Sequence, residues 1–177
     1  MRANDVGSLF EASLERVFSS LSNSHLFFWH KLADTGSTAG ARAALGKQPS
    51  DYLIGFAGHA ALCEAKSSTK HDTMSKELMQ GSQRNAINRW AFANDLPYYV
   101  IFWSINTKTL QVWDGRAVPY SGRGLNPKGL LLEVKVGGKT PMSLDEDVVK
   151  TAVMDVLNIK ATRLKALADN RKSWGVE

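Results

Sequence analysis

DYLIGFAGHAALCEAK, residues 51–66, has two short apolar runs on either side of a glycine-containing turn. This pattern predicts a β-hairpin with arms at 51–56 and 59–66. Side chains two apart on a strand point to the same face, so Glu64 and Lys66 are expected to be neighbours. The turn can bring Asp51, at the start of the first arm, beside them.

This arrangement has the chemistry of a metal-dependent hydrolase. Two carboxylates, with a backbone carbonyl such as that of Ala65, form an all-oxygen site that suits Mg²⁺, and Mn²⁺ is expected to substitute for it. A lysine beside the ion can orient a water molecule and stabilise a developing oxyanion. These are the parts that metal-assisted phosphodiester hydrolysis requires.

A Glu-x-Lys triplet alone is weak evidence, and the chain has a second one at Glu133-Val-Lys135. The first is preferred because Pro49-Ser-Asp51 precedes it across a short hairpin and a polar, basic helix follows it. The nearest aspartate before Glu133 is Asp114, across a loop rich in glycine and proline. Glu133 and Lys135 are therefore interpreted as a solvated or salt-bridged strand face.

Hydrophobic periodicity predicts helices and strands along the whole chain. Their order indicates one α/β domain over residues 1–177, with a mixed central sheet flanked by helices. A Ser143-Leu-Asp-Glu146 capping box is expected to open the last helix. The expected elements are a helix at 5–21, a strand at 26–30, the hairpin, a helix at 74–94, strands at 98–103, 109–113 and 130–136, and a helix from about 146 to 168.

Composition narrows the class of protein. The chain is 44% hydrophobic and 22% charged, as in ordinary folded domains, and its only cysteine, Cys63, excludes an internal disulfide and is expected in the core. We expect no membrane span and no secretory signal, hence a cytoplasmic protein. The net charge of +5 favours a polyanionic partner.

At Pro49-Ser-Asp51…Glu64-Ala-Lys66 the sequence resembles the PD-(D/E)XK nuclease superfamily. It looks most like the Holliday-junction resolvases of the archaeal and RecU-like bacterial or phage branches, and this implies a restriction-endonuclease-like fold. The resemblance extends in order over about 7–104, whereas 105–170 adds strands and a helix outside it. Its further pieces are Gly7-Ser-Leu-Phe-Glu11, Gly36-Ser-Thr38, Gln83 and the apolar run 97–103.

The resemblance implies roles for particular residues. The implied metal ligands are Asp51, Glu64, the carbonyl of Ala65 and Glu11, although Glu15, one turn later, competes with Glu11. Lys66 and Gln83 complete the implied catalytic set, with Gln83 bonding to the lysine, the nucleophilic water or a phosphate. The expected DNA contacts are Ser37, Thr38, Lys70, Lys76, Arg84 and Arg89.

The resulting hypothesis is a Mg²⁺-dependent endonuclease that cuts four-way DNA junctions as a homodimer, in a bacterial, archaeal or phage-infected cell. The dimer follows from the resemblance, since two symmetric cuts need two equivalent sites. Its interface is expected at 27–29 or on the C-terminal helix. Two alternatives stay open: a restriction- or repair-type endonuclease of the same superfamily acting on duplex DNA, and a non-catalytic DNA-binding protein with this fold.

Overall fold

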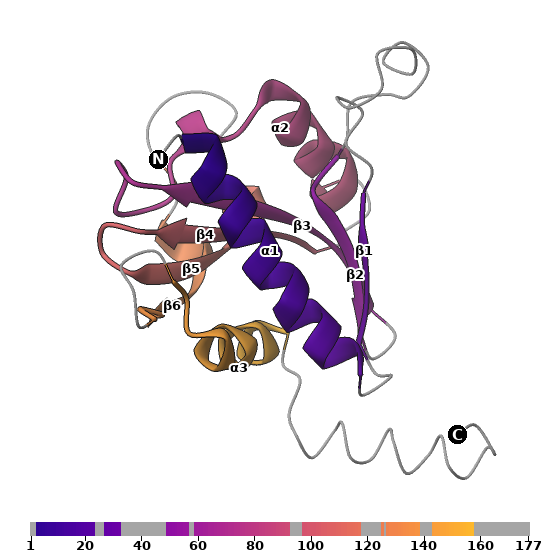
Figure 1. Cartoon of the computed structure of the whole chain (residues 1–177). Coiled ribbons are helices and arrows are strands. Elements are labelled where there is room, and N and C mark those ends of the chain that lie inside the picture. The colour runs from indigo at the N-terminus through magenta and orange to yellow at the C-terminus, as the bar shows by residue number, and fades with distance from the viewer. Residues whose placement is uncertain are drawn as a thin grey trace, which may run out of the picture.

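The computed structural model describes residues 3–23, 27–32, 49–56, 59–92, 97–117, 125, 127–138 and 143–157 (Figure 1). Six strands form one sheet in which the spatial order follows the chain order. The helices are α1 (Ala3–Ser22), α2 (Gly81–Ile87) and α3 (Glu146–Val156). The strands are β1 (Phe27–Lys31), β2 (Tyr52–Phe56), β3 (His59–Ser68), β4 (Tyr98–Ser104), β5 (Thr109–Asp114) and β6 (Leu130–Lys135).

The sheet is mixed. Strands β3 and β4 are parallel, while every other neighbouring pair is antiparallel. A parallel pair needs a long crossover, and α2 lies in the segment that joins β3 to β4. The predicted single α/β domain with a mixed sheet flanked by helices is confirmed.

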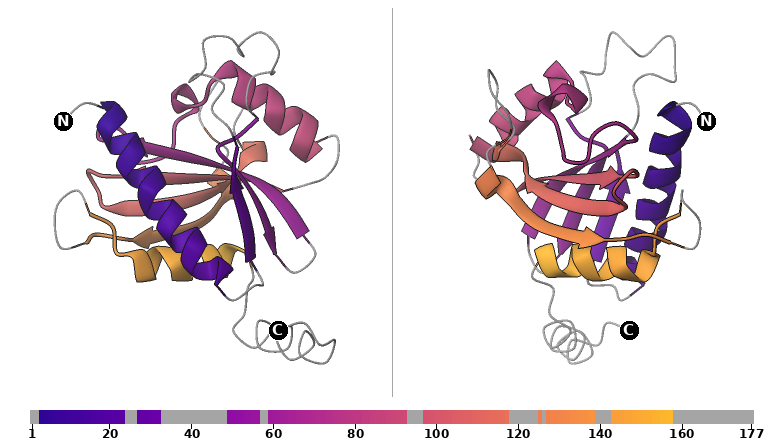
Figure 2. Two further views of the ribbon diagram at one scale, coloured as in Figure 1. Left: turned by 45° about the vertical axis from the view of Figure 1, so that its right-hand side comes forward. Right: turned by 90° about the vertical axis from the view of Figure 1, so that its left-hand side faces the viewer.

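The helices cover the two faces of the sheet unequally. Helices α1 and α3 pack on one face and α2 lies over the other, as Figure 2 shows. Strand β4 is buried between these layers, with Trp103 in the core on the α1 side and Phe102 in the core on the α2 side. Cys63 is fully buried on the α1 side, as expected. No helix in the described parts of the chain is long and apolar enough to cross a membrane.

The predicted helix at 74–94 is broken into three pieces. A 3₁₀ turn occupies Lys76–Leu78, α2 begins at Gly81, and a π-helical turn, Asn88–Phe92, follows it. The break arises at Gln80, which has an extended backbone and whose N–H donates to Oε1 of Gln83 at 2.9 Å. This capping contact starts a new helix where the apolar periodicity alone predicts a continuous one.

The start of α3 also differs from the expectation. Asp145, rather than Ser143, is the N-cap residue, and its carboxylate accepts from the N–H groups of Asp147 at 3.1 Å and Val148 at 3.2 Å. An ionised cap accepts these bonds more strongly than a hydroxyl and also favours the helix dipole. The predicted continuation to about 168 lies outside the described residues, which end at 157.

The packing of α1 predicts how two of its leucines contribute to the free energy of unfolding. Leu14 is fully buried in the core, whereas Leu9 on the same helix is 43% exposed. We expect Leu14→Ala to lower the free energy of unfolding by about 2–5 kcal/mol, because it leaves a cavity. Leu9→Ala is the matched control and should change it by less than about 0.5 kcal/mol. Urea denaturation measures both, and equal effects would contradict this packing of α1.

Candidate active site

Asp51 and Glu64 meet because of the register of the β2–β3 hairpin. Tyr52 pairs with Cys63, so Asp51, one residue earlier, lies opposite Glu64, on the face that α2 covers. Two hydrogen bonds fix Asp51. Its Oδ2 accepts from the N–H of Ala65 at 2.8 Å, and its backbone carbonyl accepts from the N–H of Leu32 at 2.8 Å.

The Glu64 carboxylate is completely buried, with 0% exposure. One of its oxygens, Oε1, accepts from Nζ of Lys66 at 2.6 Å and from Nε2 of Gln83. The other oxygen, Oε2, is also buried, and no donor in the described part of the chain bonds to it. A buried carboxylate oxygen that accepts no hydrogen bond is costly when the group is ionised, and this one lies on the side chain that faces Asp51.

The two carboxyl groups act on each other in opposite ways. The charge of Asp51 disfavours ionisation of Glu64, whereas a hydrogen bond with Glu64 lowers the pKa of Asp51. Burial raises the pKa of Glu64 to about 8; the charge of Lys66 opposes this rise, and the charge of Asp51 adds to it. Burial also raises the pKa of Asp51, while the hydrogen bond from Ala65 acts in the opposite direction. A cation bound between the two groups would relieve both effects.

The donors at this point fit a magnesium or manganese ion. The N–H of Ala65 points at Asp51, and both backbone groups of a strand residue face the same side, so the Ala65 carbonyl faces it too. Within the described ranges, no group of three or more Asp, Glu, His or Cys side chains is placed to hold one ion. Mg²⁺ is often bound by only one or two carboxylates and several waters, and Asp51, Glu64 and the Ala65 carbonyl match that pattern.

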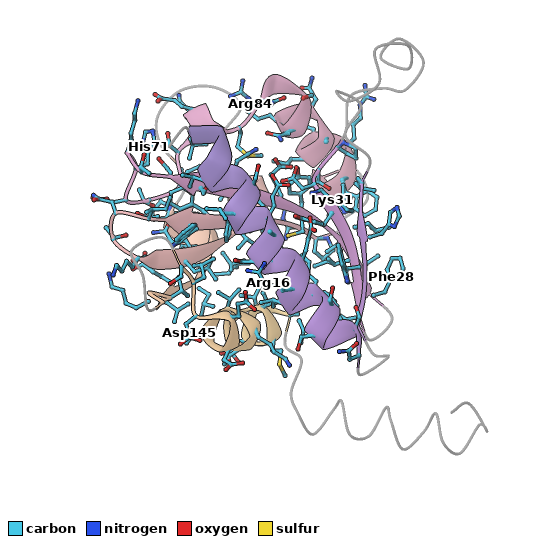
Figure 3. All side chains as sticks on the ribbon, in the orientation of Figure 1. Arg16, Phe28, Lys31, His71, Arg84 and Asp145 are labelled. Atoms are coloured by element: carbon cyan, nitrogen blue, oxygen red, sulfur yellow. The ribbon has the colours of Figure 1, made fainter. Side chains whose placement is uncertain are left out.

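Glu11 and Glu15 are tied to a lysine that the sequence analysis did not single out. Lys31 Nζ lies 3.0 Å from Oε2 of Glu11 and 2.8 Å from Oε1 of Glu15. Figure 3 shows Lys31 beside the β1–β2 end of the sheet. These bonds, first the one to Glu15, raise the pKa of Lys31. Glu11 is close enough to raise the pKa of Asp51, but the structure does not place it in one ligand group with Asp51 and Glu64.

Lys31 and Tyr98 are the site residues that the sequence did not reveal. Lys31 is opposite Tyr52 in the β1–β2 pair, so the strand register would have been needed to find it. The hydroxyl of Tyr98 donates to the carbonyl of Pro49 at 2.8 Å and so holds the chain that leads into Asp51. As the first residue of an apolar strand, Tyr98 gave no signal beyond packing.

The remaining candidates occupy different positions. Gln83 is buried at 8% exposure and bonds to Glu64, so it belongs to the carboxylate cluster. Lys70 and Arg89 are exposed, Lys76 and Arg84 are half-buried, and Figure 3 labels Arg84 at α2. Ser37 and Thr38 lie outside the described residues.

The second Glu-x-Lys triplet has no such cluster. Glu133 is exposed and accepts from Gln111 Nε2 at 2.6 Å. Lys135 is also exposed and donates to the carbonyl of Thr107 at 3.0 Å and to Oγ1 of Thr109 at 3.1 Å. The triplet lies on strand β6, at the edge of the sheet, and this agrees with its interpretation as a surface strand face.

The chain is similar to several solved structures. No protein-family model matches the chain, and no curated protein matches it. A solved structure of Archaeoglobus fulgidus Hjc, a Holliday junction resolvase from an archaeal hyperthermophile, is similar with a TM-score of 0.44 and 12% identity, over 73% of this chain and 88% of that one.

The buried carboxylate predicts a pH effect on stability. Burial raises the pKa of Glu64 to about 8 from its ordinary value of 4.5. Between these values the unfolded carboxyl ionises while the folded one stays protonated, so the stability of the fold decreases as pH rises. In EDTA, Glu64→Gln should therefore gain stability over the wild type as pH rises from about 5 to 8.5, by a few kcal/mol. Thermal unfolding measures this gain. Glu133→Gln, the exposed control, should show none, and a constant difference for Glu64→Gln would contradict the burial of an ionisable carboxyl there.

Proposed function

We propose that this protein is a metal-dependent DNA endonuclease that hydrolyses phosphodiester bonds. The observation that carries the proposal is the buried Oε2 of Glu64, which no donor among the described residues reaches and which lies opposite Asp51 and beside Lys66. A purely structural carboxylate gains nothing from burial beside a second acid. The two carboxyl groups suit a bound cation, and the lysine beside them suits a phosphate.

Each residue of the cluster has a separate task in this proposal. Asp51, Glu64 and the Ala65 carbonyl hold the ion, which when bound supplies Lewis-acid stabilisation of charge on the phosphoryl group. Lys66 orients the attacking water and donates to the developing negative charge. Gln83 is a positioning residue, because its bond fixes the Glu64 carboxylate. Glu11 acts on Asp51 from α1 as a further negative charge near the ion.

We further propose four-way DNA junctions as the substrate and a homodimer as the active form. The order of motifs over residues 7–104, which resembles that of junction resolvases, supports the substrate, and the net charge of +5 supports a nucleic acid. Phosphate contacts are assigned to Lys70, Lys76, Arg84 and Arg89, and to Ser37 and Thr38. The cytoplasm, where bacterial, archaeal and infecting phage DNA lies, is the proposed location.

The metal requirement is tested by removing either carboxylate. Asp51→Asn and Glu64→Gln should each abolish cleavage, because each removes an anionic ligand, and DNA binding should stay near the wild-type level. Gel assays of cleavage and binding in Mg²⁺ measure both. Glu133→Gln should cleave normally, and undiminished cleavage in excess EDTA would rule out the metal mechanism.

The chemical role of Lys66 is tested against the lysine of the second triplet. Lys66→Ala should lower the single-turnover cleavage rate about a hundredfold or more, as removal of one donor to a developing oxyanion does. Lys135→Ala should leave the rate unchanged, since Lys135 bonds to a surface turn. An unaltered rate for Lys66→Ala would place the active site elsewhere in the chain.

Substrate choice is tested by competition. Unlabelled duplex should displace a labelled four-way junction poorly, because a two-fold dimer engages two strands of a junction at once and one site on a duplex. Rising salt should weaken both complexes and eliminate duplex binding first. Equal competition per phosphate would instead favour the restriction- or repair-type endonuclease that acts on duplex.

A further inference from the structure

A groove of about 940 Å³ lies between α2 and the face of strands β2 and β3 that α2 covers. Its floor includes Leu53 and Leu62, and Asn85, Arg89 and Trp90 are among the residues that form the wall on the α2 side. This volume is in the range of small-molecule sites, and the groove combines apolar side chains with a few polar ones.

The groove starts where the proposed active site ends. Leu53 and Leu62 are paired across β2 and β3, and the Asp51–Glu64 positions are two residues further along the same face. Two strand residues span about 7 Å. A phosphate bound to an ion at these two carboxylates would therefore have its neighbouring nucleotide at the mouth of the groove.

The lining has the chemistry of a nucleobase site. Trp90 is half-buried, and its indole N–H donates to the carbonyl of Pro97 at 2.9 Å, which fixes the ring in the groove. Asn85 is exposed and carries an amide that both donates and accepts. An aromatic ring for stacking, an amide for base edges and an arginine are the features with which proteins bind unpaired bases.

We propose that this groove receives the base of an unpaired nucleotide next to the scissile phosphate. The inference rests on the proposed nuclease function and adds the place where the substrate strand is read. The floor of Leu53 and Leu62 suits the flat face of a base and not a phosphate, which needs several donors. A branch point supplies an unpaired base without the energy needed to open a duplex.

A side chain introduced at Gly81 can be used to block the groove. It lies at the start of α2 in the groove lining, and a Cβ added there would meet no described atom within 4 Å. Gly81→Phe should therefore fill the groove without disturbing the core, and its thermal midpoint should equal that of the wild type or exceed it, since glycine disfavours helix. Gly81→Ala is the partner variant, which changes the backbone in the same way but adds little bulk.

Binding to a four-way junction tests the proposal, with Asp51→Asn added to every variant to prevent cleavage. Abasic residues are placed at each of three positions on either side of the branch point in turn, always on both symmetry-related strands. For the intact junction, Gly81→Phe should bind about tenfold more weakly than Gly81→Ala, as expected for loss of one base–aromatic stack. At one abasic position the two variants should bind equally, because no base is left to exclude.

The outcomes separate this inference from the proposed function. A tenfold difference that disappears at one abasic position supports the groove, even if the protein with Asp51 intact cleaves no DNA and the nuclease proposal fails. Cleavage by that protein, with Gly81→Phe and Gly81→Ala binding equally to the intact junction, overturns the groove and leaves the nuclease proposal standing. A difference that persists at every abasic position indicates contact with the sugar-phosphate backbone and also overturns it.

Discussion

The hydrogen-bond register between β2 and β3 is the constraint on which the site depends. It puts Asp51 opposite Glu64, and the period of two along the strand puts Glu64 and Lys66 on one face. A slip of one residue would send Glu64 to the α1 face and bring Cys63 to the α2 face. The register is well determined, because Tyr52, Ile54 and Cys63 fill the core against α1 and would all lose their places in such a slip.

Strand β4 and helix α2 shield the Glu64 carboxyl group from solvent. Strand β4 lies parallel to β3 and covers its other edge, with Val100 beside Glu64. Helix α2 then brings Gln83 over the carboxylate. Lys66 and Gln83 satisfy one oxygen of Glu64, whereas the other is left without a donor among the described residues. The fold therefore holds a carboxyl group whose ionisation is unfavourable until a cation arrives.

The sequence predicted the parts of this account that local patterns encode. Two apolar runs around a glycine-containing turn were sufficient for the hairpin, and the apolar run from Tyr98 was sufficient for a strand. It did not predict contacts between distant segments. Lys31 meets Glu11 and Glu15 only because β1 pairs with β2 beside α1, and no spacing along the chain encodes that meeting. The break before α2 was missed because a side-chain cap at Gln80 and Gln83 overrides apolar periodicity.

Locating a bound ion is the most direct test of whether Asp51 and Glu64 form a metal site. Crystals of the protein soaked in Mn²⁺ would show the ion by its anomalous scattering. We predict one peak between Asp51 and Glu64, within about 2.0–2.3 Å of the Glu64 Oε2 atom that is unpartnered here and near the Ala65 carbonyl. The same soak of Glu64→Gln should lose the peak. An ion bound instead between Glu11 and Glu15, or an empty site between Asp51 and Glu64 at millimolar Mn²⁺, would contradict the account.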